Sequence, residues 1–350
     1  MQNLLDSILQ EFLTKNFGTE AITEKVTAVV QHENNVSTIT VSMPFYLGSF
    51  ANVLKQQLIT VFKEHYPDDN TVVNIETKII AHKNKNLVRG LENVKNIIAI
   101  SSGKGGVGKS TVTANMALAL CKMGARVGIL DADIHGPSQP IIFGVKLDDV
   151  NKKSLAPVAT HGIYLSSIGF YLTKDDPIVW RGPMVSRAFE QMIHDVSWPE
   201  LDYLLLDMPP GTGDIAITLV KKIPVTAAII VTTPQKLACA DALKSLQMFK
   251  KSNVDVLGVI ENMSGYSCQH CGCNNSIFGE DGGNMLAQSN DIPLLGKIPL
   301  HSKIRANADQ GNSVSGDDSS YSQYYADVAV KFSAELSCRT ADIMRQFSDD

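Results

Sequence analysis

A glycine-rich segment with two lysines could bind the phosphates of a nucleotide. It reads GKGGVGKST and follows the apolar run Ile97–Ile100. Glycines allow backbone N–H groups to turn inward around an anion, Lys109 can reach the β and γ phosphates, and Ser110 can offer its hydroxyl to Mg²⁺. The segment therefore predicts a Walker A phosphate loop that opens a helix. The residues expected to bind ATP in this loop are Gly103, Lys104, Gly105, Gly106, Val107, Gly108, Lys109, Ser110 and Thr111.

Carboxylates that could serve the same chemistry follow two other apolar runs. Asp131 and Asp133 come after Val127–Leu130, and Asp207 ends the run that begins at Tyr203. Ligands of open α/β sheets bind at the carboxyl ends of the strands, so carboxylates placed there can orient water and metal. Asp207, as the acid that ends a Walker B strand, is expected to hold Mg²⁺ through water. Ordinary strand-end capping is the alternative for Asp131 or Asp133.

The loop after Asp207 contains two prolines and two glycines before Asp214. The prolines stiffen the loop and the glycines give it a flexible exit, which suits a switch that senses the γ-phosphate. Asp214 is expected to be the N-cap of the helix that follows.

Three of the six cysteines cluster, at Cys268, Cys271 and Cys273. Two thiolates at C-x-x-C spacing can bind one edge of a metal centre. A [4Fe-4S] cluster needs four thiolates, so one such pair requires a second chain or an external ligand, and a symmetric homodimer provides both pairs. A shared zinc site that adds Cys273 or His270 is the competing hypothesis. A thioredoxin-like redox pair is disfavoured because the motif does not open a helix in a thioredoxin-like unit.

Short continuous apolar runs, separated by helical segments, must position these residues. Such runs are typical of strands buried on both faces of a parallel sheet with helices on either side. They predict an α/β fold with a doubly wound, mostly parallel sheet. The runs are Ile97–Ile100, Val127–Leu130, Tyr203–Leu206, Ala227–Val231 and Val256–Ile260.

The first 80 or so residues read differently and predict a small α+β domain. Two amphipathic helical stripes and three strand-like runs follow one another in the order α-β-β-α-β, and the second run, Ser37–Met43, alternates between apolar and polar side chains as a half-buried strand does. The second helical stripe includes Val53. The expected division is a domain over 1–81, a polar linker over 82–95, and a nucleotide-binding domain over 96–350.

Composition disfavours several classes of protein. The chain has 350 residues, a net charge of −5, 44% hydrophobic and 19% charged residues, which is typical of a globular protein and gives no general attraction to nucleic acid. It has no cationic leader-like N-terminus and no apolar run near the ~18 residues of a membrane span. We therefore expect a cytoplasmic protein that binds neither nucleic acid nor membrane.

The motifs together resemble a known family. Lys104, directly after the first glycine, is similar to the second lysine of the deviant-Walker class, which includes MinD and ParA. The segments SSGKGGVGKST, DADIHGPSQP, WRGPM (Trp180–Met184) and DMPPGTGD together resemble the Mrp/ApbC/Nbp family of iron-sulfur carrier ATPases, from about Val94 to His301. The N-terminal segment is similar to the MIP18-like domain that precedes the ATPase in bacterial members.

The resemblance implies roles for particular residues of the nucleotide site. Lys104 would cross to the nucleotide of the partner in an ATP-sandwich homodimer. Lys104, Lys109 and Asp133 would be the catalytic residues, and Asp133 would position the attacking water. Asp131 would support the Mg²⁺ shell completed by Ser110 and Asp207. Asn262 would contact adenine, with a turn-forming role as its alternative.

The resemblance also implies an activity. Cys268 and Cys271 would hold the cluster, although Gln269 departs from the common C-P-x-C form. The expected protein is an ATPase that hydrolyses ATP to ADP and phosphate, carries a [4Fe-4S] cluster across a homodimer, and passes it to apo iron-sulfur clients or exchanges it with assembly factors. The alternatives are a MinD/ParA-like spatial-organisation ATPase, a zinc-stabilised regulatory ATPase, and an electron-transfer protein.

Overall fold

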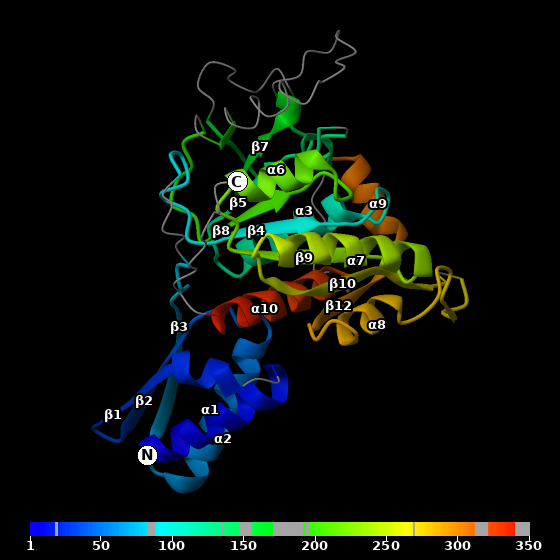
Figure 1. Cartoon of the computed structure of the whole chain (residues 1–350). Helices are drawn as coiled ribbons and strands as arrows, with labels where there is room; N and C mark the ends of the chain where they lie inside the picture. Colours follow the sequence, from blue (N-terminus) through cyan, green and yellow to red (C-terminus); the bar gives the residue numbers. More distant parts are fainter. Residues whose placement is uncertain are drawn as a thin grey trace. The chain divides into compact units, whose positions relative to one another are not determined.

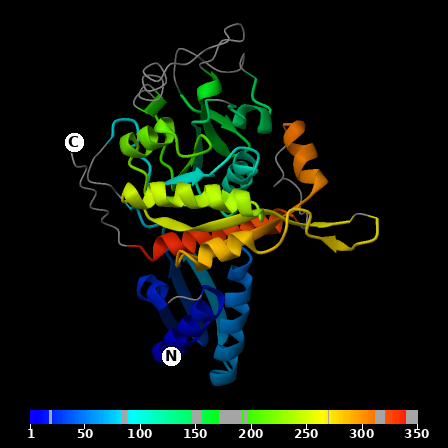
Figure 2. The same cartoon turned by 45° about the vertical axis from the view of Figure 1, so that its right-hand side comes forward.

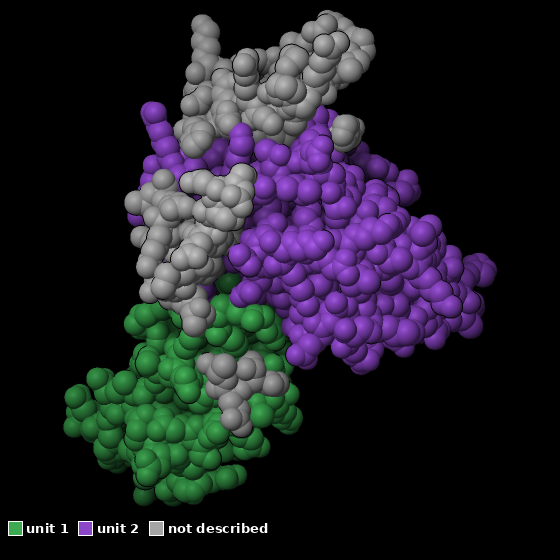
Figure 3. Space-filling view, in the orientation of Figure 1, with its two compact units in different colours: residues 1–80, 330–340 green, residues 81–329, 341–350 purple. Residues whose placement is uncertain are grey.

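The computed structural model describes residues 1–17, 20–82, 88–134, 136–146, 156–170, 192–193, 196–268, 270–311 and 321–339. The chain divides into two compact units, which Figure 3 colours separately. One unit contains Met1–Ile80 with Val330–Thr340, and the other contains Ala81–Ala329 with Ala341–Asp350.

The N-terminal unit has the expected order of elements. Its elements are α1 (Gln2–Phe17), the 3-10 helix η1 (Glu20–Lys25), β1 (Thr27–Glu33), β2 (Val36–Met43), α2 (Phe50–His65) and β3 (Asn70–Thr77). The strands form a sheet in the order β1-β2-β3, antiparallel and then parallel. Every second residue of β2 is buried, as the alternating pattern predicts. Val53 is 55% exposed, contrary to its predicted place in the apolar stripe, because the buried face of α2 runs through Leu54, Leu58 and Phe62.

The second unit is built on one mostly parallel sheet. Over the described residues nine strands pair in the order β11-β10-β9-β4-β8-β5-β7-β6, and β12 adds to β10. Only the β6–β7 and β10–β11 pairs are antiparallel. The strands are β4 (Ile97–Ser101), β5 (Val127–Asp131), β6 (Val158–Thr160), β7 (Ile163–Ser167), β8 (Tyr203–Asp207), β9 (Ala227–Thr232), β10 (Val256–Ser267), β11 (Asn274–Asn275) and β12 (Leu294–Leu300).

All five strands predicted from continuous apolar runs are present, as β4, β5, β8, β9 and β10. In β4, β5 and β8 every residue is buried, which is why these strands show no alternation in the sequence. The sequence did not predict β6, β7, β11 or β12. In β12 a glycine, a lysine and a proline interrupt the apolar residues, so the run LLGKIPL lacks a strand pattern.

Helices cover both faces of this sheet, as the doubly wound fold predicts (Figure 1). Alternate side chains of the central strands pack with α6, α7 and α8 in one core cluster. Helix α3 also contacts the central strands but contributes no side chain to that cluster. The helices of the described chain from residue 81 onward are α3 (Lys109–Lys122), α4 (Gln139–Ile142), the 3-10 helix η3 (Ile168–Phe170), α6 (Asp214–Lys222), α7 (Lys236–Lys251), α8 (Gly282–Gln288), α9 (Ser302–Asp309) and α10 (Ser322–Ser337).

The strand order brings the three chemical motifs together. Strand β8 lies between β4 and β5 and is parallel to both. The carboxyl ends of the three strands therefore share one edge, with Asp131 directly opposite Asp207 in the register. The phosphate loop follows β4 at the same edge, so the fold assembles a site from segments that are far apart in the sequence.

Candidate functional site

The phosphate loop connects β4 to α3, and steric restrictions explain why several of its positions are glycine. Gly106 and Gly108 have φ values of +81° and +83°, a left-handed conformation that side chains other than glycine rarely adopt. A Cβ on Gly108 would lie 2.2 Å from Nδ2 of Asn262, and one on Gly103 would lie 2.0 Å from the backbone of Asp241. The loop is therefore pressed between β10 and α7, and α3 begins directly after it.

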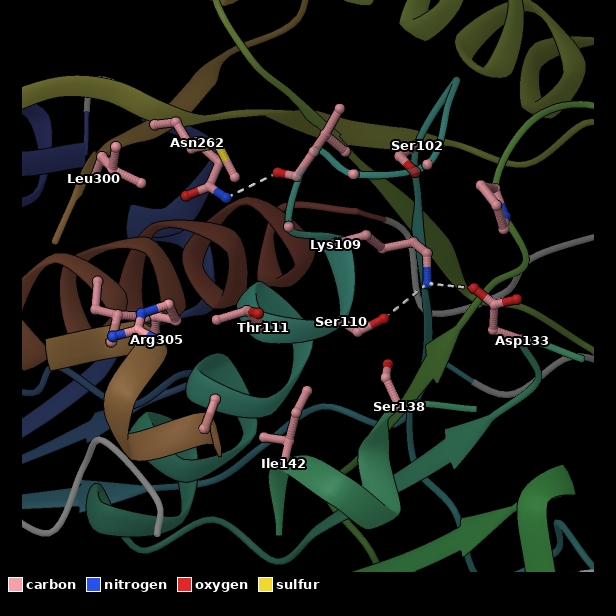
Figure 4. A pocket seen from close by; sticks show the side chains of 18 of the residues that line it. Ser102, Lys109, Ser110, Thr111, Asp133, Ser138, Ile142, Asn262, Leu300 and Arg305 are labelled. Atoms are coloured by element: carbon pink, nitrogen blue, oxygen red, sulfur yellow. Dashed lines mark hydrogen bonds and ion pairs between the residues drawn. The ribbon is translucent and has the colours of Figure 1, made fainter. Parts of the chain in front are cut away.

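Lys109 is the buried cation of the site, with 5% of its surface exposed. Its Nζ lies 2.5 Å from Oδ1 of Asp207, 3.2 Å from Oγ of Ser110 and 3.7 Å from Oδ2 of Asp133, as Figure 4 shows for the last two. A buried charge needs such partners to offset its lost hydration. The structure thus brings together the lysine, the hydroxyl and two of the carboxylates that the sequence singles out.

Asp131 turns toward the chain that follows it and is not among the residues that line the cavity over the phosphate loop. Its Oδ1 accepts a hydrogen bond from the N–H of Asp133, and its Oδ2 accepts from Oγ of Ser167 and the N–H of Gln139. Burial, followed by the charge of Asp207, raises the pKa of Asp131 to about 7. Asp131 therefore orders the segment after β5, in contact with the backbone of Asp133.

Two further residues hold Asp207, and neither was predicted. Thr113 Oγ1 lies 3.3 Å from Oδ1 of Asp207, and Gln139 Nε2 donates to Oδ2 at 2.7 Å. Thr113 is four residues after Lys109, on the same face of α3, so helical spacing could have indicated it. Gln139, which reaches Asp207 from α4, lies in the segment DADIHGPSQP, but the spacing of that segment does not relate it to Asp207.

A cavity of about 540 Å³ opens over the phosphate loop. Polar groups of the loop, Asp133 and Ser138 line one part of it (Figure 4). Residues of β12 and α9 line another part, including Leu300 and Arg305, and sequence reasoning missed this wall. Asn262 also lines the cavity and donates from Nδ2 to the carbonyl of Val107 at 2.8 Å. A polar cradle beside a wall that combines apolar side chains such as Leu300 with Arg305 fits a nucleotide, with its phosphates on the loop and its base beyond.

The residues around the loop also fit a magnesium ion. Ser110 supplies a hydroxyl and Asp207 supplies a carboxylate, both beside Lys109, and Mg²⁺ prefers such oxygen ligands. One buried oxygen nearby, Oε1 of Gln139, has no hydrogen-bond partner. When bound there, Mg²⁺ would offset the negative charge of the phosphates.

Lys104 lines the same cavity and is half-buried. It also lies near Cys239 of α7. Burial raises the pKa of the Cys239 thiol, and the charge of Lys104 acts in the opposite direction. The two lysines of the loop therefore have different surroundings, since Lys109 is buried among carboxylates and Lys104 is a half-buried residue of the cavity lining.

The cysteine motif forms a tight turn between β10 and β11. The N–H of Cys268 donates to the carbonyl of Cys273 at 2.9 Å, and the N–H of Gly272 donates to the carbonyl of Cys268 at 2.8 Å. The backbone N–H of Cys271 and then that of His270 lower the pKa of the Cys268 thiol. A thiol with a lowered pKa is a better metal ligand, because metals bind the thiolate.

The turn is exposed and is not a complete metal site in one chain. Cys271 and Cys273 are exposed and Cys268 is partly exposed. No group of three or more His, Cys, Asp or Glu side chains in the described part of the chain is arranged to hold a metal ion. Gln269 lies outside the described residues.

One strand connects the cavity to the cysteine turn. Strand β10 passes Asn262 in the cavity wall and reaches Cys268 six residues later, and its end forms with β11 a hairpin that projects from the sheet in Figure 2. Its register with β12 shifts between Asn262 and Tyr266, and Met263 has a φ of +55°. This irregularity bends the strand between the two sites.

Two predictions around the site need comment. Asp214 is not the N-cap of α6: Gly213 holds that position and Asp214 is the first helical residue. Its carboxylate remains favourable there, because the first turn carries the positive end of the helix dipole. The WRGPM segment, Trp180–Met184, lies outside the described residues, as does His135.

Comparison with known proteins decides the family. A family model described as ParA, NUBPL iron-transfer P-loop NTPase, matches residues 93–333. An iron-sulfur cluster carrier protein from Haemophilus influenzae is 40% identical over 340 residues, which cover 96% of this chain and 92% of that protein. The chain belongs to the NUBPL iron-transfer family of P-loop NTPases. The resemblance inferred from the motifs is thereby confirmed.

Solved structures agree with this NUBPL-family assignment. A nucleotide-binding protein from Archaeoglobus fulgidus in complex with ADP is 37% identical, with a TM-score of 0.58 over 67% of this chain and 94% of that one. MinD in the MinC:MinD cell division complex of Aquifex aeolicus, at 23% identity and a TM-score of 0.50 over 67% of this chain and 94% of that one, shows the shared fold. Within the described residues no helix is long and apolar enough to span a membrane.

Proposed function

We propose that this NUBPL-family protein binds and hydrolyses ATP, holds a [4Fe-4S] cluster between two copies of itself, and transfers the cluster to apo iron-sulfur proteins. The observation that carries the proposal is the placement of two sites along one strand. The wall of the phosphate cavity contains Asn262, which lies on β10. The partly exposed Cys268 and the exposed Cys271 follow directly after the end of that strand.

The proposed hydrolysis follows from the geometry around Lys109. Loop N–H groups and Lys109 would neutralise the phosphates, and Ser110 and Asp207 would hold Mg²⁺, with Asp207 acting through water. Asp133, 3.7 Å from Lys109 Nζ, would orient the attacking water in line with the γ-phosphate. Because phosphoryl transfer depends mainly on positioning and charge, this arrangement needs no covalent intermediate.

Other residues would support or extend the site. Asp131 would support the metal shell indirectly, by ordering the chain around Asp133 and Gln139. Asn262 would contact adenine from the cavity wall. Lys104 would reach the nucleotide of a second copy, and this role gives ATP a direct influence on the dimer.

The proposed cluster site follows from the number of thiols. A [4Fe-4S] cluster takes four thiolates, and Cys268 with Cys271 supply two. Two copies related by a two-fold axis would supply all four from exposed turns, which also leaves the cluster accessible to an acceptor. Clients and assembly factors would meet this exposed turn. We further propose that residues 1–81 form a MIP18-like domain, 82–95 a linker and 96–350 the ATPase domain.

Anaerobic reconstitution with iron and sulfide tests this proposal. We expect about four irons per dimer, a brown chromophore, and elution of the loaded protein as a dimer in size-exclusion chromatography. The double variant Cys268→Ala, Cys271→Ala should lose nearly all bound iron, because both thiolates of each chain are gone. Cys273→Ala, in the same exposed turn, is the matched control and should retain it.

Two outcomes would contradict the cluster assignment. A loaded species that elutes as a monomer would contradict the shared cluster. Equal iron loss in Cys273→Ala would show a different ligand set, and zinc bound in preference to iron would favour the zinc-stabilised alternative.

A further inference from the structure

Gln139 is a buried polar residue that touches all three chemical segments of the nucleotide site. None of its surface is exposed. Its Nε2 donates to Oδ2 of Asp207 at 2.7 Å and to the carbonyl of Ser110 at 3.0 Å. Its backbone N–H donates to Oδ2 of Asp131 at 3.2 Å. One residue therefore links the phosphate loop, the end of β5 and the end of β8.

These contacts fix the orientation of the amide. Both partners of Nε2 are acceptors, a carboxylate oxygen and a carbonyl oxygen, so the reversed amide would place oxygen against oxygen. Oε1 must point the other way. It is buried there with no hydrogen-bond partner.

An unpartnered buried oxygen is unfavourable, so its position indicates where a donor is supplied by something that binds. The neighbours of Gln139, Ser110 and Asp207, are the residues that the proposed function assigns to Mg²⁺. Magnesium sheds its water reluctantly and keeps several water molecules in protein sites. Those water molecules are strong hydrogen-bond donors.

We propose that Gln139 is a positioning residue of the magnesium site. Its Nε2 holds the carboxylate of Asp207 against the carbonyl of Ser110, and its Oε1 accepts a hydrogen bond from a water molecule of the Mg²⁺ shell. This inference rests on the proposed binding of Mg²⁺ and ATP. It concerns how the metal is held. Nucleotide that binds without metal depends on the phosphate loop and Lys109 and does not involve Gln139.

The test measures binding of a fluorescent ATP analogue to the full-length protein, in EDTA and over a range of Mg²⁺ concentrations. Gln139→Met keeps the length of the side chain and removes both the donor and the acceptor. We expect its affinity in EDTA to stay within about twofold of wild type, while the Mg²⁺ concentration for half-maximal effect rises at least about tenfold, as for other residues that orient metal ligands. Gln139→Glu, with a second oxygen facing Asp207, should show a larger rise.

Thr113→Val is the matched control, because it removes a different hydrogen bond to Asp207 at 3.3 Å and leaves Oε1 of Gln139 in place. We expect its Mg²⁺ requirement to rise less than about threefold. A Gln139→Met protein with the wild-type requirement, or with the same rise as Thr113→Val, would overturn the inference. A thermal unfolding midpoint in EDTA close to that of wild type shows that a variant is folded. If Gln139→Met does not fold, the Mg²⁺ requirement of Gln139→Glu decides the question. Absence of nucleotide binding in wild type would instead overturn the proposed function.

Discussion

At the scale of single residues, the nucleotide site depends on close approach of backbone and charge. Lys109 lies among Ser110, Asp133 and Asp207. The attraction between its ammonium group and the carboxylates offsets the cost of removing these charges from water. Gly108, directly before Lys109, allows the loop to take this path, because the backbone there has a left-handed conformation and lies directly against the amide of Asn262. Gly108 is thus required both because a Cβ would collide with Asn262 and because the backbone there has a positive φ.

Gly108→Ala should therefore damage the loop far more than Gly105→Ala. The new Cβ at position 108 would lie 2.2 Å from Asn262 Nδ2 at a φ of +83°, whereas a Cβ on Gly105 meets nothing within 4 Å. We expect Gly108→Ala to lower the free energy of unfolding by about 1–3 kcal/mol and to weaken ATP binding more than about tenfold. Gly105→Ala should change the free energy of unfolding by less than about 0.5 kcal/mol. Urea unfolding and nucleotide titration of both variants check this, and equal effects would contradict the steric explanation.

At the scale of secondary-structure elements, β4, β5 and β8 are aligned at both of their ends. Their carboxyl ends carry the site. At their amino ends Asp202, just before β8, accepts a hydrogen bond from the N–H of Arg126 at 3.0 Å and pairs with Nζ of Lys95 at 2.8 Å. Burial by itself would raise the pKa of Asp202, but these hydrogen bonds outweigh it and lower the pKa below its usual value.

This arrangement predicts a pH-dependent contribution to stability. A carboxyl group with a lowered pKa in the folded state stabilises the protein above its unfolded pKa of about 3.9, and the contribution is lost as the pH falls through the folded value. Asp202→Asn should therefore cost about 1–3 kcal/mol of unfolding free energy at pH 7 and progressively less below about pH 4.

Glu200→Gln is the control, since Glu200 also pairs with Arg126 but has 75% of its side chain exposed. We expect it to cost less than about 0.5 kcal/mol at either pH. Chemical denaturation at several pH values measures both variants. A cost for Asp202→Asn that is constant with pH would show that its charge is not the cause.

At the scale of the whole molecule, the N-terminal unit is built from two segments that are far apart in the sequence. It includes the segment that begins at Val330, and Nζ of Lys25 donates to the carbonyls of Ser337 and Arg339 at the end of α10. A cation at a helix C-terminus is favourable because unpaired carbonyls and the negative end of the dipole lie there. The first and last helices of the described chain therefore contribute to one compact unit.

Replacing Lys25 by methionine should loosen this unit. The substitution keeps the aliphatic stem and removes two charge-assisted hydrogen bonds, so we expect a loss of about 1–3 kcal/mol from the unfolding of this unit. Hydrogen exchange should become faster in β1 and β2, while nucleotide affinity stays unchanged. Lys15→Met, at an exposed position of α1, is the control and should have little effect. If both variants exchange alike, the end of α10 does not support the unit.

The sequence by itself predicted the doubly wound sheet, five of its strands from their continuous apolar runs, the phosphate loop and the residues of the acidic and cysteine motifs. These features have local signatures, since a continuous apolar run or a fixed spacing of Gly, Lys, Asp or Cys can be read along the chain. The strands β7 and β12 lacked such a signature, because short or interrupted runs carry no period.

Tertiary structure decided the contacts that join distant segments. Gln139 and Thr113 contact Asp207, residues of α9 line the cavity, and Lys25 contacts the end of α10. Each of these contacts depends on strand order and helix packing, which bring together residues up to 314 positions apart in the chain. Gln139 lies in the segment DADIHGPSQP, but its residue type does not show what its side chain contacts. Its role becomes visible only when the folded chain places its amide between a carbonyl and a carboxylate.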